Sequence, residues 1–264
     1  MFRIKPMARK TLAIVIVVVF LAGWFSFAAF LYTNQILFVS IEGIISDFQT
    51  TVLSLHQAQV NRNIKAVVLY LNTPGGSAYP CIEIAKYVDN VKQVKTVIAI
   101  MGAQCASGGY YIASFATHIF THENTITGGI GVLSVWVDMS KYYNQTGITI
   151  WHWENDEATQ KDLGADWRPP NEEEQEMIQN EVNEIAKKIL NDIKTNRDLT
   201  DEVIEQVATG SLFLGDEAVK LGLADGIGNI ITSVEIAASM TGLWKFIIVT
   251  PDMGDRERFL RTLF

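Results

Sequence analysis

Two short apolar runs, each followed by a glycine turn and a helix-forming stretch, constrain the fold of this chain most strongly. Residues 66–71 lead into the turn of residues 72–76, and residues 97–101 lead into the turn of residues 105–109. Runs without polar alternation predict strands that are buried on both faces, which is typical of a parallel sheet covered by helices. The sequence therefore predicts a layered α/β fold of parallel strand, turn and helix units, with both turns at the same edge of the sheet.

The N-terminal segment has the sequence pattern of a membrane anchor. Residues 11–32 carry no charged side chain, and the four charged residues of residues 1–10 are all basic. This length and charge bias predict a transmembrane helix over residues 11–32, with a cytoplasmic tail over residues 1–10 and the remainder outside the cytoplasm. A cleaved signal peptide is the alternative, although its apolar core is usually only about 7–15 residues long.

Length and composition limit the rest of the chain. The sequence has 264 residues and a formal charge of −8, or −12 without the four basic residues of residues 1–10. We expect a catalytic domain over residues 33–245, a tail over residues 246–264, and no binding of nucleic acid to so acidic a domain. Cys81 and Cys105 are too few for a disulfide framework, and no spacing of cysteine and histidine indicates a metal or cofactor site.

Ser107 is the candidate nucleophile, because it stands where the second apolar strand turns into a helix. A serine hydroxyl attacks a carbonyl only when a base takes its proton, and the amides of Gly75, Gly76 and Gly108 would then hold the resulting oxyanion. The simpler interpretation is that Ser107 caps the helix that follows it, since serine is a common residue at that position. A glycine turn between a strand and a helix also needs no function.

Five motifs in order along residues 36–240 resemble the signal peptide peptidase A (SppA) family. They are Asn72-Thr73-Pro74-Gly75-Gly76, Ala106-Ser107-Gly108-Gly109-Tyr110-Tyr111, Thr127-Gly128-Gly129-Ile130-Gly131-Val132, Lys161-Asp162-Leu163-Gly164 with Arg168-Pro169, and Gly222-Leu223-Ala224-Asp225. The resemblance implies a membrane-anchored serine endopeptidase with a crotonase-like or ClpP-like fold, assembled as a homo-oligomeric ring. It implies Ser107 as nucleophile, Lys161 as general base, and signal peptide remnants or other apolar peptides as substrates.

One position departs from the pattern of that family. The third motif often reads Gly-Ser-Ile-Gly, with a serine that orients the lysine, and this chain has Gly129 in its place. Thr127 is two residues earlier and carries a hydroxyl. We therefore expect Thr127 or a water molecule to orient Lys161.

Other bases and other functions stay open at this stage. Lys141 is a rival lysine, and a histidine base would come from His56, His118, His122 or His152. A crotonase-like enzyme acting on acyl-CoA thioesters would use the same glycine turn for its thioester oxygen. A catalytically weak scaffold at the membrane is the third possibility.

Overall fold

The computed structural model of the protein describes residues 6–251, with side chains from residue 14 onward except at residue 31. The chain divides into two compact units. The sequence predicts one catalytic domain over residues 33–245, and this range contains residues of both units. The first unit contains the described residues up to Gly129 together with those from Gly210 onward. The second unit is Ile130–Thr209. The predicted tails at residues 1–10 and 246–264 lie partly outside the described residues.

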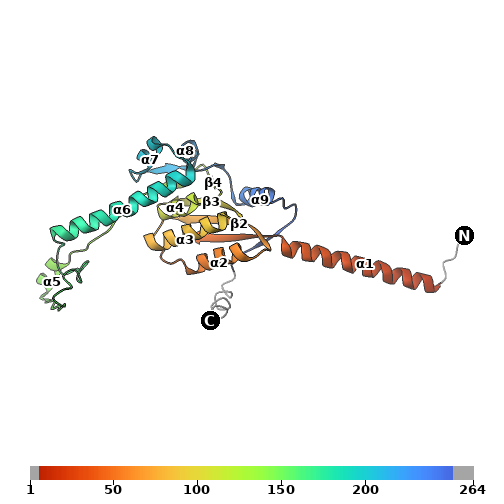
Figure 1. Ribbon diagram of the computed structural model, residues 1–264, viewed down its shortest axis with the longest axis horizontal. Coiled ribbons are helices and arrows are strands. Elements are labelled where there is room, and N and C mark those ends of the chain that lie inside the picture. Colours follow the sequence, from red (N-terminus) through yellow and green to blue (C-terminus); the bar gives the residue numbers. More distant parts are fainter. Residues whose placement is uncertain (1–5, 252–264) are drawn as a thin grey trace. The chain divides into compact units, whose positions relative to one another are not determined.

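The first unit is built on one mixed sheet (Figure 1). Its strands are β1 (Gln35–Glu42), β2 (Ile64–Thr73), β3 (Thr96–Ala106), β4 (His118–Thr121), β5 (Ile126–Gly128), β6 (Leu212–Leu214), β7 (Gly226–Ile227) and β8 (Ile247–Val249). The main path runs β6-β5-β3-β2-β1-β8, while β4 pairs with β3 and β7. All pairs are parallel except β5 with β6, which confirms the predicted parallel α/β fold.

Helices bury both faces of this sheet. They are α2 (Gln49–Val60), α3 (Ala78–Lys92), α4 (Gly108–Ser114), α8 (Gly215–Lys220) and α9 (Ile230–Met240). Helix α1 (Pro6–Thr33) precedes β1 in the chain and is not one of these covering helices. Ala66, Val68 and Ile98 pack in one core cluster with residues of α9. Their alternating neighbours Val67 and Val97 are also fully buried. Because successive strand residues point to opposite faces, burial of both sets explains why the two runs show no polar alternation.

The second unit consists of α5 (Ser140–Thr146), α6 (Glu172–Arg197), α7 (Asp201–Val207) and the segments that join them. Asn171 caps α6: its side-chain oxygen accepts from the amide of Glu174 at 2.8 Å, and the Glu174 carboxylate accepts from the amide of Asn171 at 2.8 Å. This reciprocal capping box satisfies amides that the helix itself cannot pair. The sequence of residues 148–151 predicts a short strand after the glycine at position 147. This prediction is wrong, because these residues pair with no strand of the described part of the chain.

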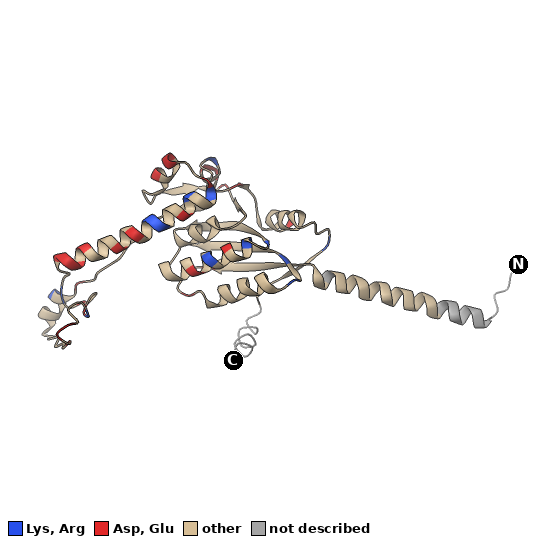
Figure 2. Ribbon diagram, in the orientation of Figure 1, with Lys and Arg blue, Asp and Glu red and all other residues tan. Residues whose placement is uncertain are grey.

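Within residues 14–29, helix α1 exposes its apolar side chains on all sides. Phe20, Trp24 and Phe25 are 67–76% exposed, and Figure 2 shows no charged residue along the part of α1 that it colours. No helix of the described part of the chain is long and apolar enough to cross a membrane. The predicted transmembrane helix over residues 11–32 is therefore not supported.

A methyl group at Gly215 tests the close contact between the start of α8 and the segment that follows β4. A Cβ there would overlap the backbone carbonyl of His122, whereas a Cβ on Gly226 would meet only the Phe120 ring at 3.5 Å. We expect Gly215→Ala to lower the free energy of unfolding by about 1–3 kcal/mol, because the backbone must shift. Gly226→Ala is the matched control. Equal denaturation midpoints for the two variants in urea would contradict this packing.

Candidate active site

The two glycine turns meet at one edge of the sheet, as the sequence predicts. Thr73 at the end of β2 is the register partner of Cys105 near the end of β3. A Cβ placed on Gly75 would lie 2.8 Å from the Cβ of Ser107 and 2.9 Å from the amide nitrogen of Gly108. The turns are thus in direct contact, and glycine is required at position 75 to allow it.

Ser107 has a backbone conformation that is unusual for a residue at the start of a helix. Its φ of 51° and ψ of −124° lie in a region that residues other than glycine rarely adopt. Its amide donates to the carbonyl of Gly128 at 2.8 Å, and its carbonyl accepts from the amide of Tyr111 at 3.0 Å. The half-buried side chain makes no capping hydrogen bond with α4. The interpretation of Ser107 as a capping serine is therefore wrong, and its hydroxyl is available for chemistry.

The three predicted oxyanion donors differ in what their amides bind. The amide of Gly75 donates to the hydroxyl oxygen of Thr73 at 3.0 Å. Among the described residues, the amides of Gly76 and Gly108 have no hydrogen-bond acceptor. A Cβ placed on Gly108 would lie 3.7 Å from the amide nitrogen of Gly76, so the two donors are close together. The geometry favours Gly76 and Gly108 over Gly75 as an oxyanion pair.

The third motif runs beside Ser107. Gly129 has a φ of +60°, and a Cβ there would lie 3.9 Å from the amide nitrogen of Ser107. Thr127 is fully buried and donates its hydroxyl hydrogen to the carbonyl of Cys105 at 2.6 Å. Only the lone pairs of that hydroxyl remain for a lysine, and the orienting role of Thr127 stays a prediction.

The two cysteines are buried beneath the Ser107 turn. Burial raises the pKa of the Cys81 thiol to about 11 and raises the pKa of Cys105 further. A Cβ on Gly108 would overlap the Cys81 sulfur. Both thiols stay protonated near neutral pH, which agrees with their interpretation as small buried apolar residues.

Lys161 lies in the second unit, in a turn closed by a hydrogen bond from its amide to the carbonyl of Ala158 at 2.9 Å. Its side chain is exposed. Within the described residues its ammonium has no hydrogen-bond or ion-pair partner. Ser107 belongs to the first unit, and the pairing of these two residues stays a prediction.

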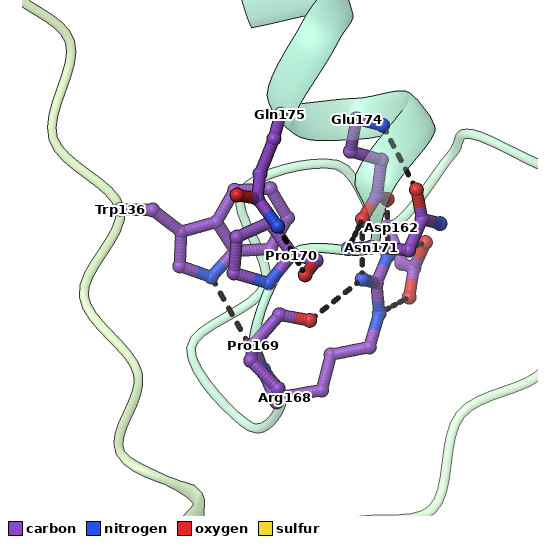
Figure 3. A network of polar contacts seen from close by, with 8 residues as sticks. All are labelled: Trp136, Asp162, Arg168, Pro169, Pro170, Asn171, Glu174 and Gln175. Carbon is purple, nitrogen blue, oxygen red and sulfur yellow. Dashed lines mark hydrogen bonds and ion pairs between the residues drawn. The ribbon is translucent and has the colours of Figure 1, made fainter.

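A charged network fixes the residue next to Lys161 (Figure 3). The guanidinium of Arg168 binds both oxygens of Asp162 at 2.6 and 2.7 Å, and both oxygens of Glu174 at 2.7 and 2.5 Å. The Trp136 ring lies 5.4 Å from the guanidinium carbon of Arg168, and its indole donates to the Arg168 carbonyl at 3.1 Å. The network ties the Lys161 segment to the first turn of α6 within this unit.

Arg168 also sets the ionisation of its two partners. Its hydrogen bonds lower the pKa of Asp162, and with the amide of Asn171 they lower the pKa of Glu174. The two carboxylates in turn raise the pKa of Arg168, with Glu174 the larger cause. The sequence alone does not predict this network. The only signal was Arg168-Pro169 just ahead of the glutamates at the start of α6.

A histidine base has little support from the fold. His118 pairs with Ile98 in the ladder of β4 and β3. Ile98 lies near the start of β3, nine residues before Ser107, which follows the other end of that strand. The ring of His118 instead lies 3.8 Å from the carboxylate of Asp225.

Comparison with protein families gives two matches. The model of peptidase family S49 matches residues 89–243, and that of Clp protease matches residues 22–124. Protease 4 of Haemophilus influenzae is 30% identical over 217 residues, which cover 78% of this chain and 35% of that protein. A putative signal peptide peptidase SppA of Enterococcus faecium is 30% identical over 209 residues, or 74% of this chain and 60% of that protein. This chain thus spans less than two thirds of the length of either relative.

A solved structure shares the fold. The 1510-N membrane-bound stomatin-specific protease, as a mutant in complex with a substrate peptide, superposes with a TM-score of 0.55 at 18% identity. The match covers 88% of this chain and 99% of the other. This agrees with the ClpP-like α/β fold that the sequence resemblance implies.

The Arg168 network gives the second unit a pH-dependent stability. Because the pKa values of Asp162 and Glu174 are lowered on folding, their contribution is complete above the ordinary carboxyl range near pH 4. It is lost as the pH falls through their folded values. We expect hydrogen-exchange protection of residues 158–175 to be high at pH 7 and lower at pH 3. Arg168→Gln should remove that protection at pH 7.

Lys220→Gln is the control for this experiment, because it removes an exposed ion pair with Asp216 in the other unit. It should leave the protection of residues 158–175 unchanged. Protection that is equal at both pH values in the unmodified protein would contradict a stabilising role of the network.

Proposed function

The chain belongs to peptidase family S49, and we propose that it is a serine endopeptidase with Ser107 as nucleophile and Lys161 as general base. The observation that carries the proposal is the backbone of Ser107. A positive φ at a strand-to-helix turn, with a hydroxyl free of any capping bond, is the arrangement that presents a nucleophile at the top of a sheet. The strain of that backbone has no structural purpose in the helix that follows.

The proposed reaction passes through an acyl-enzyme. Lys161 accepts the hydroxyl proton as the Ser107 oxygen bonds to the scissile carbonyl carbon, and the amides of Gly76 and Gly108 donate to the oxyanion. The carbon–nitrogen bond then breaks, and the lysine proton passes to the leaving amine. Water attacks the ester by the same route in reverse, which releases the acid and regenerates Ser107.

Short apolar peptides, including signal peptide remnants, are the proposed substrates. A groove of about 680 Å³ in the second unit has a mixed lining, with apolar side chains from the segment after Gly131 and from α6, and polar side chains that include Gln175, Gln179 and Glu181. Leu133 and Val135, two of the apolar residues, are 81% and 73% exposed. The apolar part of this lining favours apolar side chains of a ligand. The name of one relative, a putative signal peptide peptidase, supports the same class of substrate.

We also propose that the protein acts at a membrane, as a homo-oligomeric ring with its catalytic part on the extracytoplasmic side. The basic residues of residues 1–10 and the uncharged residues 11–32 support this location. The exposed apolar side chains of α1 support it too, since contiguous exposed apolar surface is otherwise unfavourable. The similar protease of known structure is described as membrane-bound.

Removal of either dyad residue should abolish hydrolysis. We expect Ser107→Ala and Lys161→Met to lower kcat for a fluorogenic apolar peptide by at least about 1,000-fold, because each removes a partner in the same proton transfer. A fluorophosphonate probe should label the unmodified protein and not Ser107→Ala. The measurements are initial rates and labelling followed by mass spectrometry.

Lys141→Met is the matched control, because Lys141 is the rival base in the same unit. It should keep full activity. Loss of activity in Lys141→Met with retention in Lys161→Met would overturn the assignment of the base.

Mixing Ser107→Ala with Lys161→Met tests the assembly, since recovered activity requires a site shared between subunits. Turnover of an acyl-CoA thioester with no peptide hydrolysis would overturn the peptidase proposal.

The membrane location has its own test. We expect the full chain to stay with the membrane fraction after extraction with alkaline carbonate, and a variant that begins at residue 34 to be released. External protease should digest the catalytic part in spheroplasts. Release of the full chain by carbonate would contradict the proposed anchoring.

A further inference from the structure

Thr73 is a buried side chain that contacts both glycine turns of the site. It is fully buried at the end of β2. Its hydroxyl accepts from the amide of Gly75 at 3.0 Å and lies 3.3 Å from the carbonyl oxygen of Gly75, to which it donates. Its methyl group faces the other turn, where a Cβ on Gly109 would lie 2.5 Å from it.

These bonds fix the peptide group between Gly75 and Gly76. The carbonyl of Gly75 accepts from the Thr73 hydroxyl and also from the amide of Ile45 at 2.9 Å. In a trans peptide the carbonyl and the following amide point in opposite directions. Holding the oxygen of Gly75 therefore fixes the direction of the Gly76 amide, which is one of the two free donors of the site.

Without such a restraint this peptide group would rotate easily. It lies between two glycines, which have more backbone freedom than any other residue. Gly75 already has a φ of 101°. The hydroxyl of Thr73 closes a small ring around Pro74 and limits Gly75 to that conformation.

We propose that Thr73 is a positioning residue that orients the Gly76 amide toward the oxyanion. This inference rests on the proposed peptidase function and extends it from the donors to the side chain that directs them. Thr73 does not touch the substrate. It acts through the peptide group of Gly75 and Gly76, so its removal should weaken binding of the transition state more than binding of the substrate.

The test compares Thr73→Val with Thr73→Ser. Valine keeps the shape and loses the hydroxyl, whereas serine keeps the hydroxyl and loses the methyl group. We expect Thr73→Val to lower kcat by about 10- to 100-fold with KM changed less than about threefold, by analogy with the loss of an oxyanion donor. Thr73→Ser should restore kcat to within about threefold of the unmodified protein.

A second readout separates this role from simple destabilisation. A peptide aldehyde forms a hemiacetal oxyanion on the serine, and the matching peptide alcohol does not. Thr73→Val should weaken the aldehyde by the same factor as kcat and leave the alcohol unaffected. Thr125→Val is the control, because Thr125 is also buried and its hydroxyl also bridges backbone groups, at Gly102 and His122.

Each outcome has a defined meaning. Unchanged kcat and unchanged aldehyde affinity in Thr73→Val would overturn the inference. An equal loss of affinity for the aldehyde and the alcohol would also overturn it. So would a loss of kcat in Thr125→Val that equals the loss in Thr73→Val. If Thr73→Val fails to fold, Thr73→Ser and Thr73→Ala decide: equal activity in both would overturn it. An unmodified protein that is neither labelled by fluorophosphonate nor active would instead refute the peptidase proposal.

Discussion

The parallel register of β2 and β3 is the constraint on which the candidate site depends. It pairs Thr73 with Cys105, so two turns that are distant in sequence end at the same height of the sheet. The helices α3 and α4 then leave from those turns and cover the sheet. Because both strands are buried on both faces, a shift of register by one residue would move apolar side chains into the wrong layer. The core therefore holds the turns in place.

The edge of the sheet at the site combines a glycine required by close packing with a serine in a strained backbone conformation. The close approach of Gly75 to Ser107 and Gly108 leaves no room for a side chain. Ser107 carries a side chain in a backbone region where glycine would be easier. A serine is retained where conformation favours glycine, which is the pattern expected when chemistry needs the hydroxyl.

Much of this arrangement follows from sequence. The uninterrupted apolar runs predict buried parallel strands, and Asn171 followed by glutamates predicts the start of α6, since both signals are local and strong. The short strands β6 and β7 were not predicted, because two or three residues carry no periodicity. The strand expected at residues 148–151 is wrong because apolar residues there have no strand beside them to pair with.

The details of the site depend on contacts that no local pattern encodes. The sequence indicates glycines near an oxyanion, but the bond from Gly75 to Thr73 is needed to see which amides stay free. Arg168 reaches Asp162 and Glu174, six residues away on either side, and only the fold brings both carboxylates to one guanidinium. The pairing of Ser107 with Lys161 joins two units and remains a prediction from the motifs.

The strained backbone of Ser107 opposes the stability of the fold to its proposed catalytic turnover. Holding a non-glycine residue at a positive φ costs about 1–3 kcal/mol, which is a sizeable part of the stability of an ordinary domain. Glycine at this position would make the protein more robust and at the same time inert. Selection for heat tolerance alone would thus tend to erase the nucleophile, whereas selection for turnover keeps the fold slightly less stable than its sequence permits.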